Sequence, residues 1–186
     1  GKDRQVIRTH RNRHMKAGYS VSVFSPRTAR HLEPRLREIS DQWLARNGGR
    51  EKAFALGAHD PVYVHSMPVA VVTAADGSIP AYATLWPGAD RKRIGIDLMR
   101  SADDAPNGVM DYLFAELFLW AQAEGYQQFD LNTAPLSGVA LDPALPVATS
   151  LARMTFEYGE KFYNFKGVRR FKQKFHPIWE DVFIAM

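Results

Sequence analysis

Three apolar segments follow one another at short intervals in the middle of the chain, at residues 68–74, 79–86 and 93–99. All three are expected to be β-strands, and the Asp76-Gly77 pair between the first two is a typical turn of a β-hairpin. A hairpin makes its two strands antiparallel. This excludes a purely parallel, doubly wound sheet.

Helical and strand patterns precede and follow this centre. Residues 4–17 predict a basic helix that Gly18 ends, and a second helix begins at Glu33 and stops at Asn47-Gly48-Gly49. The other expected elements are a strand at 19–24, a long helix from about Asn107-Gly108 to Glu124, a strand at 128–131, helices at 149–158 and around 163–175, and a last strand at 182–185.

This order of elements predicts a mixed α/β chain with an α+β mixed sheet. It suits the acyltransferase fold of the GNAT type, in which substrates meet where two central strands diverge. No linker-like segment divides the sequence, so residues 1–186 are expected to form a single GNAT-like domain.

The composition excludes several classes of protein. The chain is 46% hydrophobic and 24% charged, as in ordinary globular domains. It has no Cys, which excludes a disulfide scaffold, a zinc finger, an iron–sulfur site and a Cys nucleophile. The longest apolar runs, at 69–75 and 117–121, are far shorter than the roughly 20 residues of a spanning helix. No signal peptide is recognised, and we expect a soluble fragment.

The net charge of +4 is unevenly distributed. Residues 1–50 hold 12 Lys or Arg and 4 Asp or Glu, residues 51–159 hold 6 and 13, and residues 160–186 hold 6 and 3. Basic ends favour polyanions such as nucleic acid or anionic lipid headgroups. For charge alone, a solvated basic surface helix is the simpler interpretation.

Common catalytic and metal motifs are missing. The sequence has no Gly-rich dinucleotide or phosphate loop, no Gly-x-Ser-x-Gly and no His-Glu-x-x-His. His10 and His14 have the i, i+4 spacing of metal ligands, but their neighbours are Arg and Lys and no third ligand is indicated. We therefore expect an exposed basic helix there, and no metal.

Asp97 is the most informative single residue, because it lies inside an otherwise apolar strand. A carboxylate in that position must be paired, solvated in a cleft or strongly perturbed. Arg100, three residues further on, could pair with it. A site carboxylate beside an Arg that binds phosphate or carboxylate, and a structural ion pair at a strand end, are both open.

The segment after this strand bears on the choice of acyl donor. An acetyltransferase that uses CoA usually has a Gly-rich loop here, whose backbone N–H groups bind pyrophosphate at the start of the next helix. Residues 100–108 contain one Gly and the carboxylates of Asp103 and Asp104, which would repel pyrophosphate. We therefore expect that the donor is not CoA and that no cofactor is used.

Residues 162–175 interleave basic and aromatic side chains. The pattern fits phosphate contact combined with stacking, as on single-stranded nucleic acid. An amphipathic segment with Phe171 and Phe175 in the core also explains the aromatic residues, but it explains the many cations less well.

Several motifs, in order, resemble the C-terminal domain of bacterial phosphatidylglycerol lysyltransferases, the multiple peptide resistance factor family. They are Ile39-Ser40-Asp41-Gln42-Trp43-Leu44, Phe54-Ala55-Leu56-Gly57, Ile96-Asp97-Leu98-Met99-Arg100, Pro106-Asn107-Gly108-Val109-Met110-Asp111, Ala134-Pro135-Leu136-Ser137-Gly138-Val139, and residues 163–174 followed by Pro177 and Trp179. The resemblance covers nearly the whole chain. The chain departs from the family at Asp130-Leu131-Asn132-Thr133, where a Gly-Met pair is usual before Ala-Pro.

The resemblance implies an aminoacyltransferase that moves a lysyl or alanyl group from aminoacyl-tRNA to the glycerol hydroxyl of phosphatidylglycerol. It implies that this chain is the second of two tandem GNAT-like domains, which follow a transmembrane region in a longer protein. That protein would work at the cytoplasmic face of the bacterial inner membrane, against an anionic membrane surface.

The resemblance also implies roles for individual residues. Asp97 would be the general base or the anchor of the α-ammonium group, and Arg100 and Lys172 would hold the lipid phosphate or the developing oxyanion. Asn107 and Arg169 would bind substrate, and Asp103 or Asp104 could attract a lysyl ammonium. An apolar channel for the acyl chains is expected along residues 139–154.

Two alternatives from other classes stay open at this point. A CoA-dependent N-acetyltransferase would share the fold, and a thermal shift with acetyl-CoA would identify it. A non-catalytic module that binds RNA or anionic membrane would tolerate the loss of Asp97, whereas the transferase would not. The sequence does not distinguish lysine from alanine as the transferred group.

Overall fold

The computed structural model describes residues 2–47, 58–134 and 165–180. The chain divides into two compact units, Gly1–Asn132 and Thr133–Met186. The first unit is built on one five-stranded sheet with the order β1-β2-β3-β4-β5. Its strands are β1 (Ser20–Phe24), β2 (Val69–Thr73), β3 (Ala81–Pro87), β4 (Arg93–Ser101) and β5 (Gln128–Asp130).

The sheet is mixed, as predicted. Strands β1 to β4 pair antiparallel with their neighbours, and β4 and β5 pair in parallel. The expected hairpin is β2–β3, and Gly77 takes a positive φ of 84° in its turn. The parallel pair covers only residues Arg93–Gly95 of β4, because β5 ends at Asp130 while β4 continues to Ser101. The second half of β4 thus runs past the end of its parallel neighbour.

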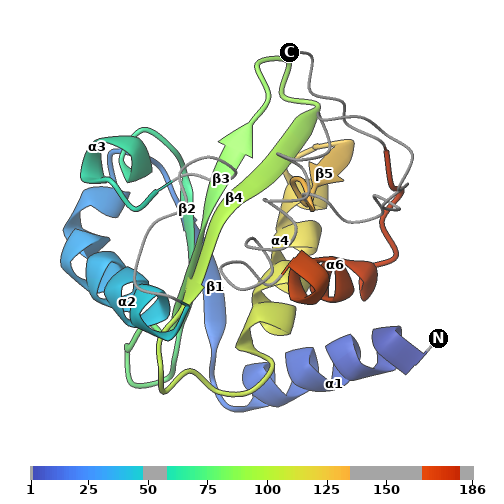
Figure 1. Ribbon diagram of the computed structural model, residues 1–186, viewed down its shortest axis with the longest axis horizontal. Coiled ribbons are helices and arrows are strands. Elements are labelled where there is room, and N and C mark those ends of the chain that lie inside the picture. The colour runs from blue at the N-terminus through green and yellow to red at the C-terminus, as the bar shows by residue number, and fades with distance from the viewer. Residues whose placement is uncertain (1, 48–57, 135–164, 181–186) are drawn as a thin grey trace, which may run out of the picture. The chain divides into compact units, whose positions relative to one another are not determined.

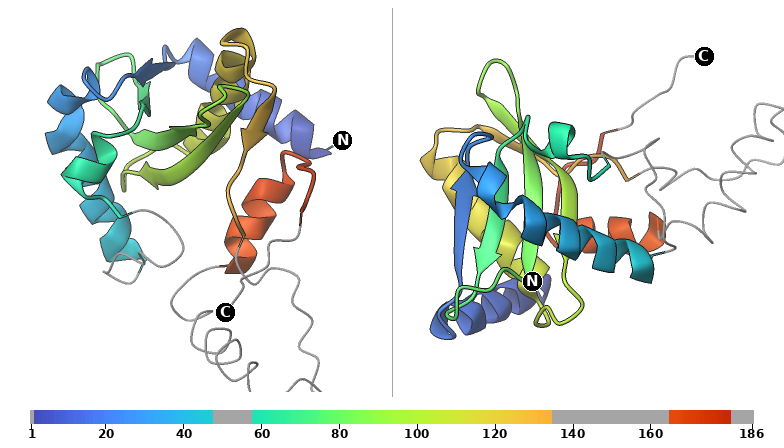
Figure 2. Two further views of the ribbon diagram at one scale, coloured as in Figure 1. Left: turned by 90° about the horizontal axis from the view of Figure 1, so that it is seen from above. Right: turned by 90° about the vertical axis from the view of Figure 1, so that its left-hand side faces the viewer.

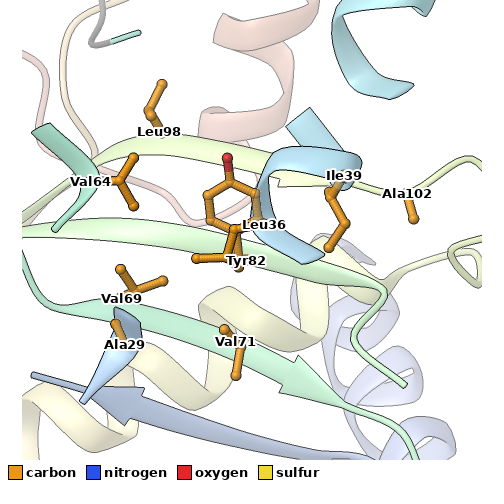
Figure 3. Close-up of a cluster of buried hydrophobic side chains, with 9 residues drawn as sticks. All are labelled: Ala29, Leu36, Ile39, Val64, Val69, Val71, Tyr82, Leu98 and Ala102. Carbon is orange, nitrogen blue, oxygen red and sulfur yellow. The ribbon is translucent and has the colours of Figure 1, made fainter. Parts of the chain in front are cut away.

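Helices cover both faces of the sheet (Figures 1 and 2). One face carries η1 (Ala29–Leu32), α2 (Glu33–Arg46) and the short helix α3 (Pro61–Val64). The other carries α4 (Val109–Ala123), against which α1 (Lys2–Lys16) packs. Figure 3 shows the core beneath α2 and α3, where nine buried side chains meet. They are Ala29, Leu36, Ile39, Val64, Val69, Val71, Tyr82, Leu98 and Ala102.

The expectation that α1 is an exposed basic helix is wrong for one of its faces, although most of its residues are exposed. His10 Nδ1 lies 2.8 Å from Asp111 Oδ2 of α4, and Arg11 Nε donates to Glu116 at 2.6 Å. His14 is only 2% exposed, and its burial lowers the pKa of the imidazole. The error arose because acidic partners more than 90 residues away in the sequence neutralise one face of a helix that is basic when considered alone. The described residues include no cluster of three or more potential metal ligands.

Gly108 is required where α1 meets the start of α4. Its φ is +82°, and a Cβ at this position would overlap the ring of His10. We expect Gly108→Ala to lower the free energy of unfolding by about 2–4 kcal/mol, since the strain of a left-handed residue and the overlap both contribute. Gly77→Ala is the matched control, because Gly77 has a similar φ but nothing within 4 Å of the added Cβ. Chemical denaturation of the two variants measures the difference, and equal losses would contradict the packing argument.

In the second unit, residues 163–175 were expected to contain short helices, and the structure has α6 (Phe165–Gln173). The helix expected at 149–158, the apolar channel along 139–154 and the strand at 182–185 lie outside the described residues. In the described part of the chain, no helix is long and apolar enough to cross a membrane.

Candidate active site

A β-bulge in β4 determines where Asp97 lies. Leu85 of β3 pairs with Ile96, and Ala83 pairs with Met99. Thr84 alone therefore lies opposite two residues of β4, Asp97 and Leu98. The buried Thr84 hydroxyl accepts a hydrogen bond from the Leu98 backbone N–H at 2.9 Å, in place of a regular ladder bond. A bulge of this kind changes the direction of the side chains around it.

As a result, two consecutive residues of β4 contact the same face of the sheet. Leu98 belongs to the core cluster that contains Val64 of α3. Asp97, which a regular strand would direct to the opposite face, meets Tyr63 of α3. The bulge therefore directs a carboxylate toward the side of the sheet that α3 covers.

Asp97 is 6% exposed and is held by two described hydrogen-bond donors. The Tyr63 hydroxyl donates to Oδ2, and the Asn132 side-chain amide donates to Oδ1 at 3.5 Å. A buried carboxylate needs such donors, and two donors on different oxygens fix its plane. Asp97 thus lies on an internal strand and is paired, which is one of the situations expected for a carboxylate inside an apolar strand.

Asn132 reaches Asp97 because the chain turns sharply after β5. Its φ is 63°, a left-handed conformation that Asn tolerates better than most residues. The Asp130 side chain stabilises the turn by accepting the Asn132 backbone N–H at 2.7 Å. The Asn132 side-chain amide therefore lies beside the part of β4 that continues beyond the end of β5.

Tyr63 and Asn132 were both missed when the sequence was read alone. A local signal for α3 existed, because Asp60-Pro61 is a typical helix start. In the structure the Asp60 carboxylate does accept the Tyr63 backbone N–H, at 3.0 Å. No sequence rule, however, connects Tyr63 to Asp97 34 residues away.

The environment of Tyr63 keeps its hydroxyl protonated. Burial first, then the hydrogen bond to Asp97 and its negative charge, raise the pKa of Tyr63. At neutral pH the group is therefore a hydrogen-bond donor, with its proton directed at the carboxylate. An ionised Tyr63 would repel Asp97.

This raised pKa makes a prediction about alkaline stability. Tyrosines in the unfolded chain lose their protons around pH 10.0, whereas Tyr63 in the folded chain resists ionisation. The contribution of Tyr63 to the free energy of unfolding is therefore complete below that pH and is lost as the pH rises above it. We expect Tyr63→Phe to reduce this alkaline loss. Some loss will remain, because burial also raises the pKa of Tyr112. Denaturation curves from pH 7 to 11 measure the effect, and parallel profiles for the two proteins would contradict it.

Arg100 lies three residues beyond Asp97 on the same strand and is 4% exposed. Its guanidinium stacks on the ring of Trp43 of α2, with 3.7 Å from Cζ to the ring centroid. A cation over an indole face is attracted by the ring electrons. Among the contacts that the structure describes, Asp97 thus meets Tyr63 and Asn132, and Arg100 meets Trp43.

The candidates that follow β4 occupy the loop before α4. Asp103 pairs with Arg46 of α2 at 2.7 Å, and its backbone N–H donates to the Gln42 side chain at 3.0 Å. Asp104 is exposed. Asn107 is also exposed, and its carbonyl accepts a hydrogen bond from Arg13 of α1. This loop is tied to α2 at one end and to α1 at the other.

The remaining two candidates belong to α6 of the second unit. Lys172 is 3% exposed, and its Nζ donates to the Thr133 carbonyl at 2.7 Å. Arg169, one helical turn earlier, places its guanidinium over the Trp179 ring at 4.9 Å. Lys172 is therefore not a solvated surface lysine.

The sheet order, the bulge and the early end of β5 agree with the expected GNAT-like fold class. The chain belongs to the phosphatidylglycerol lysyltransferase C-terminal family, whose model matches residues 1–186. This confirms the family resemblance inferred from the motifs.

Relatives of known name agree with this assignment. A phosphatidylglycerol lysyltransferase from Bacillus subtilis is 36% identical over 100% of the chain, and one from Staphylococcus xylosus is 33% identical. The chain spans only 21% and 22% of these two proteins.

Two crystal structures are also similar. One is the C-terminal domain of a protein assigned as a lysylphosphatidylglycerol synthetase from Agrobacterium fabrum, with 39% identity, 97% of the chain covered and a TM-score of 0.77. The other is L-PGS from Bacillus licheniformis, with 37% identity, 96% covered and a TM-score of 0.74. The chain covers 53% and 52% of them.

Proposed function

We propose that this chain is the catalytic part of an enzyme that transfers a lysyl or alanyl group from aminoacyl-tRNA to a glycerol hydroxyl of phosphatidylglycerol. The observation that carries the proposal is the buried Asp97 carboxylate on the bulge of β4, held by Tyr63 and Asn132. The names of the relatives support the lipid acceptor. The chain spans about a fifth of those relatives, so the activity of the whole protein is part of the proposal.

The reaction is a transesterification, and Asp97 is suited to begin it. The carboxylate takes the proton of the lipid hydroxyl while that oxygen attacks the carbonyl carbon of the aminoacyl ester. The resulting tetrahedral oxyanion collapses, the bond to the ribose oxygen breaks, and that oxygen receives the proton that Asp97 took from the lipid hydroxyl, which regenerates the carboxylate. Tyr63 and Asn132 orient the carboxylate, and Tyr63 remains a donor because its pKa is raised.

The cationic candidates have a complementary task. Arg100 and Lys172 would hold the lipid phosphate or the oxyanion, since charge-assisted hydrogen bonds are the strongest available to these groups. Both side chains are nearly completely buried, as charges that act in a water-poor site should be. Arg169 and Asn107 are proposed as weaker substrate contacts.

Asp103 and Asp104 differ in their suitability for attracting a lysyl ammonium. The carboxylate of Asp103 is already engaged by Arg46, whereas Asp104 is exposed in the same loop. Asp104 is therefore the better candidate of the two.

The proposal also covers the context of the chain. The crystal structures that it resembles are about twice its length, which supports a tandem arrangement in which this chain is one of two domains. The missing partners would be a preceding GNAT-like domain and a transmembrane region, with tRNA and an anionic bilayer as surfaces to be bound. We place the parent protein at the cytoplasmic face of the bacterial inner membrane.

The structure disfavours a CoA-dependent N-acetyltransferase. Pyrophosphate would need the free N-terminus of α4. In the structure the buried Asp111 carboxylate lies in the first turn of α4 and bonds to His10, and Arg13 binds the carbonyl of Asn107. The helix start is therefore covered by α1 and has a buried carboxylate in its first turn.

One experiment tests the transferase proposal. The complete protein is incubated with charged tRNA and phosphatidylglycerol, and aminoacyl-lipid is measured by chromatography, in parallel with the 186-residue chain alone. We expect product from the complete protein and weak or no product from the chain, because a tRNA ester needs a larger basic surface than this unit supplies. Absence of product from the complete protein would refute the function, and full turnover by the chain alone would refute the need for other domains.

A further inference from the structure

The turn between β3 and β4 combines an exposed indole with three consecutive exposed cations. We call residues 86–93 the β3–β4 tip. Trp86 is 57% exposed, and Arg91, Lys92 and Arg93 are all exposed. Figure 1 shows this turn in light green, extending at the top of the view beyond β2 and β5. Among the described residues, none forms an ion pair with these three cations.

The β3–β4 tip is an ordered turn. Gly88 N–H donates to the Arg93 carbonyl at 2.8 Å, and Arg91 N–H donates to the Gly88 carbonyl at 2.9 Å. Asp90 accepts the Lys92 backbone N–H at 3.0 Å, and the Lys92 carbonyl accepts the backbone N–H groups of Gln127 and Gln128 at the start of β5. The cations are therefore presented on a preformed backbone, so binding through them costs little ordering of the chain.

The chemistry of the tip matches a membrane interface. Indole rings are enriched at the level of lipid headgroups, because they have an apolar body and a polar N–H. Lys and Arg beside them are attracted to anionic headgroups. Three cations and one carboxylate, Asp90, leave the tip with a net positive charge. We propose that the β3–β4 tip docks this domain on the surface of a bilayer that contains anionic phospholipid.

The arrangement of the cations favours a bilayer over a nucleic acid. Arg91 and Lys92 lie in the bend before β4, Arg91 with a positive φ of 55°, and Arg93 begins the strand, so the three cations are not aligned along one extended segment. Cations that fan out around a tip can all meet a flat charged surface. A single-stranded nucleic acid is followed by cations along one groove with a series of stacking rings, whereas the tip presents a single exposed indole.

The docking proposal rests on the proposed lipid acceptor and makes it more specific. Arg93 and Asp97 are four residues apart on β4, a distance of about 13 Å along a strand. A tip seated among headgroups thus keeps the candidate carboxylate near the lipid surface, on the strand that carries both.

Vesicle binding by the 186-residue chain tests the docking surface without tRNA or turnover. The chain is sedimented with vesicles of phosphatidylcholine alone or of phosphatidylcholine mixed with phosphatidylglycerol. We expect salt-sensitive binding to the mixed vesicles. R91Q/K92Q/R93Q should weaken it roughly 100-fold, since each basic residue near an anionic surface contributes about a fivefold factor. Trp86→Ser should weaken binding while leaving its salt dependence.

The matched control removes the same charge elsewhere. Arg4 and Arg8 of α1 and Arg30 of η1 are exposed, and R4Q/R8Q/R30Q should bind nearly as well as the unaltered chain. Equal binding by both triple variants, with unchanged melting temperatures, would overturn the proposal. So would a tip variant that loses charged-tRNA binding alone, which would make the tip an RNA contact. In the complete protein with detergent-dispersed phosphatidylglycerol, the tip variant should retain its transfer rate, so a failure of docking and a failure of the proposed function give different results.

Discussion

Asp97→Asn in the complete protein is expected to reduce the rate of aminoacyl-lipid formation by about 100-fold to 10,000-fold, the contribution of a positioned general base. The amide has the size of the carboxylate and can still accept a hydrogen bond from Tyr63, but it cannot take a proton from the lipid hydroxyl. The initial rate with charged tRNA and phosphatidylglycerol measures the loss, and the melting temperature confirms that the variant is folded.

The control for this substitution is Asp41→Asn. It removes the same charge from an exposed position of α2 to which no role in the site is assigned, and it should change the rate much less than Asp97→Asn does. A folded Asp97→Asn variant with nearly full activity would remove the general base from the mechanism. If the Michaelis constant for aminoacyl-tRNA rose instead, Asp97 would be the anchor for the α-ammonium group. If neither the rate nor this Michaelis constant changed, the chain would be a binding module.

Lys172→Ala is expected to cost about 2.7–4 kcal/mol in the transfer barrier, or roughly 100-fold or more in rate, if Nζ stabilises the developing oxyanion. The structure sharpens this test. A solvated lysine would tolerate alanine within about 0.5 kcal/mol of stability, but Lys172 is 3% exposed and bonds to Thr133. Removing it leaves a carbonyl without this donor, at a further cost of about 1–3 kcal/mol in unfolding free energy.

Two variants separate these effects. Lys172→Met retains the length and apolar stem of the side chain, so it should recover part of the stability but none of the rate. Lys174, two residues after Lys172, places its ammonium group over the ring of Phe171. Lys174→Ala removes this cation and should keep most of the activity. A stable Lys172→Met protein with nearly full rate would exclude Lys172 from the reaction and leave Asp97 and Arg100 as the candidates.

Local sequence rules determined most of the elements of the first unit. The Asp76-Gly77 turn, the Gly18 and Asn47 helix ends and the apolar stripe of α4 all act over a few residues, and each element formed within a few residues of its expected bounds. The lone carboxylate in an apolar strand was equally visible, and it drew attention to Asp97. These features were predictable because turn geometry, capping and side-chain periodicity depend on near neighbours only.

The tertiary structure alone decided what surrounds that carboxylate. The bulge that turns Asp97 toward α3 exists only in the pairing of β4 with β3, and the Asn132 amide comes from 35 residues further on. The acidic partners of α1 are about 100 residues away, which is why a helix that is exposed by its sequence pattern packs one face on α4. Contacts at such separations are chosen by how whole elements pack and by which buried polar groups find partners, and neither is encoded in any short stretch of the chain.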